Sequence, residues 1–232
     1  VQAALTEHLP LAMHFAELSE EPEFLRTLGG RLRDVWNTTG KAAELLDTAI
    51  PLFTADDSSP IRWAKYWGLL DASHQIPVLL AHVNYAHDTD LEILASHHAS
   101  VVICPRTRHF FGHSLPHRYQ AMLAQGINVA MGTDSLASNP DLFLLREASF
   151  LHTLDPAVPC QTLLEMLTIR GARALGLHHE LGSLEVGKKA DIIALAFDPN
   201  FAQDAPMALE YVIANAPQPT HVWLAGTQLK PS

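Results

Sequence analysis

The sequence predicts an α/β fold, in which part of a (β/α) barrel is followed by a smaller β-rich segment. Short apolar runs typical of buried parallel strands alternate with helical segments through residues 1–180. Residues 181–232 change character and carry mostly strand-like runs. Only four barrel-type strands are recognisable, whereas a closed barrel has eight. We therefore expect an open sheet or half of a barrel over 1–180, and a small β-rich domain over 181–232.

The elements of the first region follow from the spacing of apolar residues. Four apolar runs are expected to form strands: 9–15 (LPLAMHF), 77–84 (PVLLAHVN), 100–105 (SVVICP) and 127–135 (INVAMGTDS). Helices are expected where apolar residues recur at helical spacing: 1–8, 20–49, 61–72, 88–99, 116–126, 142–154 and 160–177. A loop is expected at 51–60, which is rich in Pro, Asp and Ser. Asp88 is expected to cap one helix and Gly126 to end another.

The β-rich region is expected to contain three strand-like runs. They are 190–197 (ADIIALAF), 211–216 (YVIANA) and 221–229 (HVWLAGTQL). The Ala225–Gly226 pair inside the last run indicates a hairpin turn.

The composition excludes several classes of partner. The sequence has 15 basic and 25 acidic residues, a formal net charge of −10, and no polybasic run. No nucleic-acid partner and no anionic membrane partner are therefore expected. The apolar runs are far shorter than the about 20 residues of a membrane span.

The expected location is the cytoplasm. Two cysteines, Cys104 and Cys160, form no disulfide framework and fit a reducing compartment. No basic segment followed by an apolar one marks a signal peptide. Because the chain begins with Val1 rather than Met, we expect a processed or truncated piece.

Three expected strands end in residues suited to metal binding or acid–base chemistry, namely His14, His82 and Asp134. Parallel strands of α/β barrels present their C-terminal ends on one active face, so these side chains can converge despite their distance in sequence. Each residue also has an ordinary structural interpretation. A histidine at a strand end is commonly hydrogen-bonded, and an aspartate in GTDS can form a turn or cap a helix.

Glu17 follows His14 by three residues, which matters for its direction. Residues three apart on a straight strand point to opposite faces. Both side chains can face one site only if the chain leaves strand geometry directly after His14. The polar run ELSEE at 17–21 favours such a break.

Several motifs resemble the amidohydrolase superfamily in its metal-dependent deaminase branch. They are MHFAE, LLAHVN, SVVICPRT and GINVAMGTDSLASN, together with LGSLEVGKKADIIAL at the start of the β-rich region. The branch contains S-adenosylhomocysteine, methylthioadenosine and aminofutalosine deaminases. The resemblance implies that residues 1–180 are strands five to eight of a (β/α)8 TIM-type barrel, its C-terminal half. It also implies that 181–232 are the C-terminal segment of a small β-rich domain.

The resemblance implies a role for each strand-end residue. His14 and Asp134 are the metal ligands, of zinc most readily and of iron as an alternative, and the metal lowers the pKa of its bound water to about 7 to give a hydroxide. Asp134 also accepts the proton of that water. Glu17 protonates a ring nitrogen of the substrate. His82 hydrogen-bonds the attacking water or the developing oxyanion.

Two departures from the family pattern stand out. The family's remaining metal ligands form a His-x-His pair on the first barrel strand, and no His-x-His occurs in this sequence. The loop after CPR carries Thr107 and Arg108 in place of Ser-Asn and continues as HFFGH, which indicates a different substrate or a reshaped pocket. By resemblance only, this variant points to the aminofutalosine-like group. The substrate-binding candidates are Arg106, His109, His113 and Ser135.

Three functions stay open on the sequence. The first is hydrolytic deamination of an adenosine-like or other amino-substituted purine or nucleoside compound, a small-molecule substrate. A chlorohydrolase or another amidohydrolase of the same branch is the second. The third is a catalytically incomplete half-barrel. An isolated half-barrel would expose strand edges, so we expect a missing N-terminal half-barrel or a homo-oligomer partner.

Overall fold

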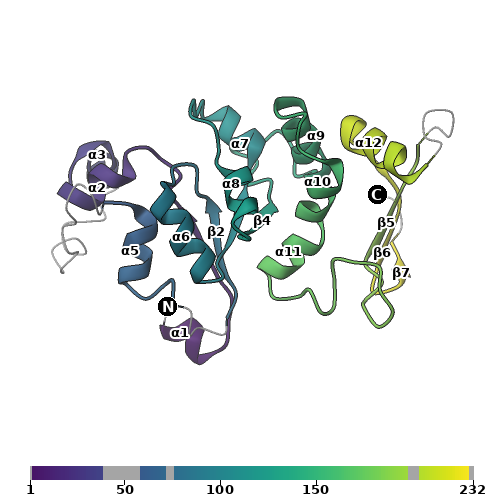
Figure 1. The fold of residues 1–232 in the computed structure, drawn as a ribbon, viewed down its shortest axis with the longest axis horizontal. Coiled ribbons are helices and arrows are strands. Elements are labelled where there is room, and N and C mark those ends of the chain that lie inside the picture. The colour runs from purple at the N-terminus through teal and green to yellow at the C-terminus, as the bar shows by residue number, and fades with distance from the viewer. Residues whose placement is uncertain (1, 39–57, 72–75, 198–203, 230–232) are drawn as a thin grey trace. The chain divides into compact units, whose positions relative to one another are not determined.

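Four strands form one sheet in the computed structural model of the chain, which describes residues 2–38, 58–71, 76–197 and 204–229 (Figure 1). The strands are β1 Leu11–Phe15, β2 Val78–His82, β3 Ser100–Ile103 and β4 Asn128–Met131, in the order β1-β2-β3-β4. β1 pairs with β2 in parallel, with His14 opposite Ala81. The four strands expected from the sequence and the α/β fold with a parallel sheet are thereby confirmed.

The chain divides into two units, which are described separately below. Unit 1 comprises Val1–Val101 and Leu115–Asn128, and unit 2 comprises Val102–Ser114 and Val129–Ser232.

Unit 1 contains β1, β2 and several short helices. These are α1 Gln2–Thr6, α2 Glu21–Thr27, α3 Gly30–Thr38, α5 Pro60–Tyr66, α6 Asp88–Ser96 and α8 Tyr119–Ala124. Helices α5 and α6 lie side by side next to β2 (Figure 1). Their buried side chains include Ile61, Leu91 and Leu94, and Leu80 of β2 is also fully buried. The expected helical segment at 39–49 and most of the expected loop at 51–60 lie outside the described residues.

The cap of α6 differs from the sequence prediction. The N-cap is His87, and Asp88 is already the first helical residue. Asp90 closes a capping box, since its Oδ2 accepts the His87 N–H at 2.8 Å while its Oδ1 accepts the Ser59 hydroxyl at 2.5 Å. Asp90 is fully buried, whereas the Asp88 side chain is 84% exposed. The prediction that Asp88 caps this helix was therefore wrong. His87 is the N-cap, and the carboxylate that bonds to its N–H is that of Asp90.

Unit 2 combines helices with a small antiparallel sheet. The helices are α7 Pro105–Phe110, α9 Leu144–Leu154, α10 Cys160–Leu167, α11 Ile169–Ala174 and α12 Ala205–Asn215. The strands β5 Ile192–Leu195, β6 Pro219–Leu224 and β7 Thr227–Gln228 follow the order β5-β6-β7. Helices α9, α10 and α12 pack on one another, with Leu163, Met166 and Ile213 fully buried. Ala225 and Gly226 both have positive φ, 47° and 78°, so the predicted hairpin turn is confirmed.

Three sequence predictions fail in unit 2. Of residues 211–216, expected to be a strand, 211–215 belong to α12 and Ala216 is its C-cap. Asp204 caps the start of that helix by accepting the Met207 N–H at 2.9 Å, and Pro206 fits its first turn. The single helix expected at 160–177 is interrupted at Thr168, whose φ of −124° and ψ of −97° are not helical. The presumed loop after Cys104 contains α7, with Pro105 in its first turn.

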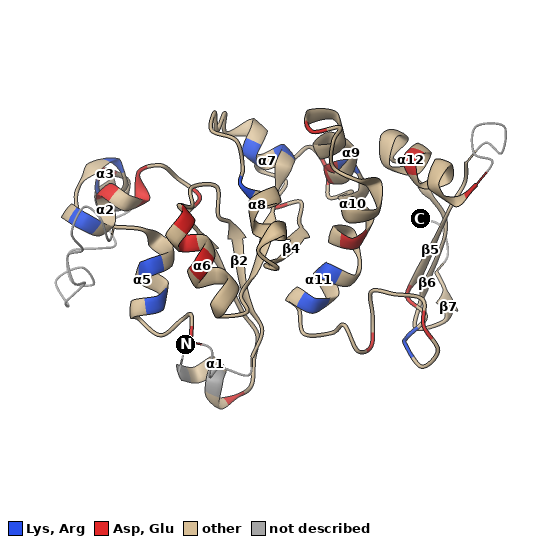
Figure 2. Ribbon diagram, in the orientation of Figure 1, with Lys and Arg blue, Asp and Glu red and all other residues tan. Residues whose placement is uncertain are grey.

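Charged residues of both signs occur on the described elements. Figure 2 shows Lys and Arg on several elements, among them α5, α7 and α11, and Asp and Glu on others, among them α6. None of the helices in the described ranges has the length and apolarity that a membrane crossing requires. Neither Cys104, which is buried, nor Cys160, which is half-buried, forms a disulfide.

Candidate metal centre

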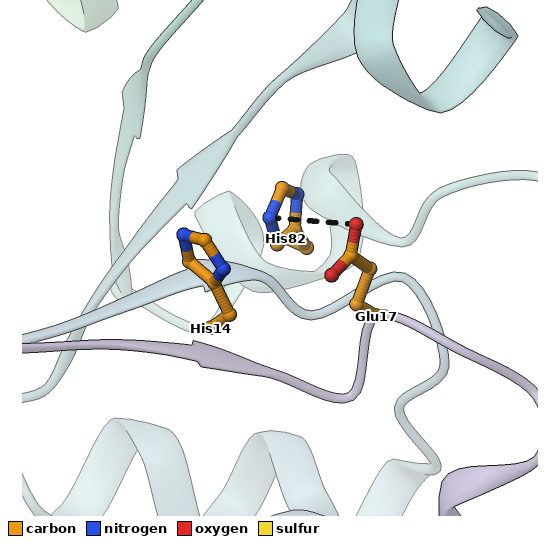
Figure 3. Close-up of side chains that lie close together, drawn as sticks. All are labelled: His14, Glu17 and His82. Carbon is orange, nitrogen blue, oxygen red and sulfur yellow. Dashed lines mark ion pairs between the residues drawn. The ribbon is translucent and has the colours of Figure 1, made fainter. Parts of the chain in front are cut away.

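His14, Glu17 and His82 come together at the ends of β1 and β2 (Figure 3). One potential ligand atom from each lies within 4.8 Å of the others. The His82 Nε2 atom is 3.7 Å from Glu17 Oε1, and the two imidazole rings meet edge to face with centroids 5.0 Å apart. Within the described part of the chain, this is the one group of three His, Cys, Asp or Glu side chains with such spacing. Three of the residues singled out from the sequence therefore form one cluster.

The backbone at the strand ends explains how these side chains converge. β1 ends at Phe15, and Ala16 follows with φ of 48°; β2 ends at His82, which has φ of 72°. The left-handed conformation turns the chain out of the strand, so Glu17 can face the same side as His14 although it is three residues away. The predicted break in strand geometry is thereby confirmed, and it lies at Ala16. Such a conformation costs an L-residue about 1–2 kcal/mol.

Glu21, at the start of α2, holds this turn. Its Oε1 accepts the N–H groups of Glu17 at 2.6 Å and Leu18 at 2.8 Å, and its Oε2 accepts the N–H of Ala16 at 2.9 Å. A typical hydrogen bond contributes about 1 kcal/mol net, so three of them offset the strain at Ala16. Burial raises the pKa of the Glu21 carboxyl, and the three backbone hydrogen bonds act in the opposite direction. The role of Glu21 was not predicted from the sequence, although the acid stands only four residues after Glu17.

Neighbouring groups fix the remaining main chain of the cluster. The Asn84 side-chain amide donates to the Glu17 carbonyl oxygen at 3.2 Å, and His117 Nε2 lies 2.8 Å from the carbonyl oxygen of His82. The three clustered side chains differ in burial, since His82 is only 2% exposed, Glu17 is half-buried and His14 is exposed. The cluster therefore has a buried side at β2 and an open side at β1.

The cluster suits a divalent metal in the chemistry of its donors. Zinc in proteins binds imidazole nitrogens and carboxylate oxygens. In catalytic sites it commonly has three protein ligands and one position open to water or substrate. Two imidazoles and one carboxylate lie within ligand reach of one another, and the imidazole of His14 is accessible. The residues present fit such an ion.

Asp134 lies in unit 2, three residues after the end of β4. It has φ of 59°, and its Oδ2 accepts the Ser138 hydroxyl at 3.3 Å. The Ser138 hydroxyl is in turn 3.1 Å from the buried Thr107 hydroxyl. Gly132 precedes this turn, and a Cβ there would lie 2.8 Å from Val102 Cγ1, so the glycine of GTD permits close strand packing.

The buried carboxylate of Glu147, which was not predicted from the sequence, supports the Asp134 turn. The Asn139 amide donates to Glu147 Oε1 and to the Thr133 carbonyl oxygen, both at 2.6 Å, while Glu147 Oε2 accepts the Arg106 N–H at 3.0 Å. Glu147 is fully buried. Burial raises the pKa of its carboxyl, and the hydrogen bonds from Arg106 and Asn139 act in the opposite direction. An acid on the apolar face of the helix at 142–154 was the available signal.

The four predicted substrate-binding residues also lie in unit 2. The Arg106 guanidinium pairs with Asp141 at 3.0 and 3.2 Å, and these hydrogen bonds hold the pKa of the Asp141 carboxyl well below its usual range. The His109 ring contacts Phe150 edge to face, with centroids 5.2 Å apart. The His113 ring lies 6.3 Å from the Phe111 ring, and Ser135 Oγ accepts the Ala137 N–H at 3.3 Å. Their contact with a substrate stays a prediction.

Comparison with known proteins identifies the family. The family model described as "Amidohydrolase family" matches residues 1–229. The chain belongs to the amidohydrolase family. The 5-methylthioadenosine/S-adenosylhomocysteine deaminase of Thermoanaerobacter pseudethanolicus is 33% identical to this amidohydrolase chain over 209 residues, which cover 87% of the chain and 46% of that relative. The amidohydrolase chain thus spans less than half the length of this curated relative.

Solved structures of a deaminase and of a chlorohydrolase share the fold. The aminofutalosine deaminase of Helicobacter pylori matches with a TM-score of 0.75 and 22% identity, covering 99% of this chain and 54% of that one. The zinc complex of atrazine chlorohydrolase from Arthrobacter aurescens TC1 matches with a TM-score of 0.73 and 21% identity, covering 98% and 45%. The α/β fold predicted for this amidohydrolase chain is that of its structural neighbours.

Proposed function

We propose that the protein containing this chain is a metal-dependent hydrolytic deaminase of an adenosine-like or other amino-substituted purine or nucleoside compound. The convergence of His14, Glu17 and His82 at adjoining strand ends carries this proposal. The name of the relative from Thermoanaerobacter pseudethanolicus supports the reaction type and a nucleoside-like substrate. The aminofutalosine deaminase fold neighbour supports the same substrate class.

The proposed cofactor is a divalent metal ion, zinc in the first place and iron as the alternative. Of the clustered side chains only His14 is a proposed ligand in this chain, together with Asp134, and Glu17 and His82 take part in the reaction instead. The zinc-containing fold neighbour supports the choice of metal. The assignment of Asp134 rests on its place in the GTDS motif. When bound, the metal supplies Lewis acidity and lowers the pKa of water, so that a nucleophile is available near neutral pH.

Each side chain has one proposed step in the reaction. Asp134 accepts a proton from the attacking water, which adds to the ring carbon that carries the amino group. Glu17 donates a proton to the adjacent ring nitrogen, so that negative charge does not accumulate on the ring. His82 is buried beside Glu17 and hydrogen-bonds the oxygen that is being added. The proton held by Asp134 then passes to the amino group, which leaves as ammonia, and the added hydroxyl returns its proton to Glu17 as the product carbonyl forms.

The remaining assignments belong to the same proposal. Residues 1–180 are proposed as half of a closed TIM-type barrel, completed by a missing N-terminal half-barrel or by a homo-oligomer partner, and 181–232 as part of a small β-rich domain. The proposed substrate contacts are Arg106, His109, His113 and Ser135. A cytoplasmic location, with neither nucleic acid nor membrane as partner, is proposed from the composition.

A chlorohydrolase is the second candidate function. The sequence motifs alone do not distinguish the leaving group, and atrazine chlorohydrolase shares the fold with a TM-score of 0.73 and 21% identity. In both reactions water attacks an sp² ring carbon. They differ in the leaving group, which is ammonia in a deaminase and chloride in a chlorohydrolase.

A release assay on the full-length protein separates the two functions. Adenosine, S-adenosylhomocysteine, methylthioadenosine, aminofutalosine, guanine and cytosine would be tested for ammonia release, and atrazine for chloride release. We expect ammonia from at least one adenosine derivative, and activity that is lost with a chelator and restored by zinc. Chloride release without ammonia from any amino compound would instead assign the chlorohydrolase function.

A further inference from the structure

We propose that Glu21 is a positioning residue of this site, which holds the turn at residues 16–18 so that the Glu17 carboxylate faces His82. The proposal deepens the proposed function and rests on it for the catalytic role of Glu17. Neither side chain oxygen of Glu21 belongs to the cluster of His14, Glu17 and His82. Glu21 therefore acts through the main chain and not on a substrate.

The geometry of the turn carries the proposal. Three consecutive N–H groups, those of Ala16, Glu17 and Leu18, point at one carboxylate with distances of 2.6–2.9 Å. Successive N–H groups converge in this way where a left-handed residue interrupts the chain, and the concavity that they form binds an anion. Ala16, with φ of 48° and no exposed surface, is that residue. The Glu21 carboxylate supplies the anion from within the chain.

The hydrogen bonds of Glu21 fix the direction in which Glu17 leaves the backbone. The Glu17 N–H is bound by Glu21 at 2.6 Å, and its carbonyl oxygen by Asn84 at 3.2 Å. With both main-chain groups held, only side-chain rotations of Glu17 are left, and they place Oε1 3.7 Å from His82 Nε2. A displacement of about 1 Å in a reacting group can lower a rate by about 100-fold.

The adjoining acid, Glu20, provides a matched control. Glu20 Oε1 pairs with Arg31 at 3.2 Å, and its Oε2 accepts the Ser19 hydroxyl at 3.0 Å. Its carboxylate makes none of the three hydrogen bonds to the turn, which all go to Glu21. Glu20→Gln thus removes a charge one residue away without removing a turn contact.

The test uses four variants of the full-length protein: Glu21→Ala, Glu20→Gln, Glu17→Gln, and Glu17→Gln combined with Glu21→Ala. We expect Glu21→Ala to lower kcat by about 10–100-fold with KM within threefold, because the misplaced group acts in the chemical step. In a protein that already carries Glu17→Gln, adding Glu21→Ala is expected to lower the remaining kcat by less than threefold, since Glu21 acts through Glu17. Glu20→Gln is expected to keep kcat within twofold.

Equal losses from Glu21→Ala in both backgrounds would overturn the proposal, because they would mark a general structural role. An unchanged kcat would overturn it as well. If Glu21→Ala does not fold, Glu21→Gln is used instead, which retains one acceptor oxygen and is expected to lower kcat by about tenfold.

Amide hydrogen exchange keeps the outcome separate from that of the proposed function. The amides of residues 16–18 are expected to exchange faster in Glu21→Ala than in the parent or in Glu20→Gln, in a protein of any activity. Unchanged exchange would show that Glu21 does not hold the turn. The parent protein could release no ammonia while the amides of Glu21→Ala still exchange faster than those of the parent. That result would contradict the proposed function but not the role of Glu21 in holding the turn.

Discussion

Replacing Asp134 with asparagine in the full-length protein is expected to lower the rate of deamination by about 1,000-fold or more, because the proposed base loses its proton-accepting charge. Asparagine has the same shape, and its carbonyl oxygen can still accept the Ser138 hydroxyl, which lies 3.3 Å from Asp134 Oδ2. The fold should therefore stay intact. Ammonia release measures the first effect, and circular dichroism with the thermal unfolding midpoint measures the second.

Asp88→Asn is the matched control for this change. The Asp88 side chain is 84% exposed on α6, so removing its charge should leave ammonia release within twofold of the parent. Retention of more than a tenth of the parent rate in Asp134→Asn would contradict the role proposed for Asp134.

Glu17→Gln is expected to lower kcat by about 100–10,000-fold, the range of general acid–base catalysis. Glutamine keeps the length and the contact beside His82 but cannot deliver a proton to a ring nitrogen. KM should change little, since the proton transfer contributes to the chemical step rather than to binding. Steady-state ammonia release over a range of substrate concentrations separates the two constants. A kcat within tenfold of the parent would remove Glu17 from the proposed acid–base chemistry.

The sequence predicted the strand-end residues because their position follows from strand periodicity. His14 and His82 end two apolar runs that pair in parallel, with Phe15 opposite His82, so their convergence needed only the register of one sheet. The turn after His14 was also predictable, since Glu17 could not otherwise face the same side.

The supporting carboxylates were not predictable in the same way. Glu21 accepts main-chain N–H groups at the left-handed turn of Ala16. Glu147 accepts the Arg106 N–H and the Asn139 amide beside the left-handed turn of Asp134. These partners depend on the conformation of the two turns. Nothing in residue spacing reveals a contact such as that of Glu147 with Arg106, which is 41 residues away. Buried acids in apolar segments are therefore the signal to examine.

The wrong prediction of a strand at 211–216 has a local cause. Val212 and Ile213 favour strands by propensity, but they lie in the third turn of a helix whose start is marked by Asp204 and Pro206. Packing of α12 on α9 and α10, with Ile213 fully buried, stabilises the helix.

An anomalous difference map, measured at the zinc absorption edge on crystals of the full-length protein prepared with zinc, tests the proposed metal centre most directly. We expect a peak about 2.0–2.1 Å from a ring nitrogen of His14, next to Glu17 and His82. Bound zinc with no peak at His14 would contradict the assignment of this cluster as the metal-dependent site.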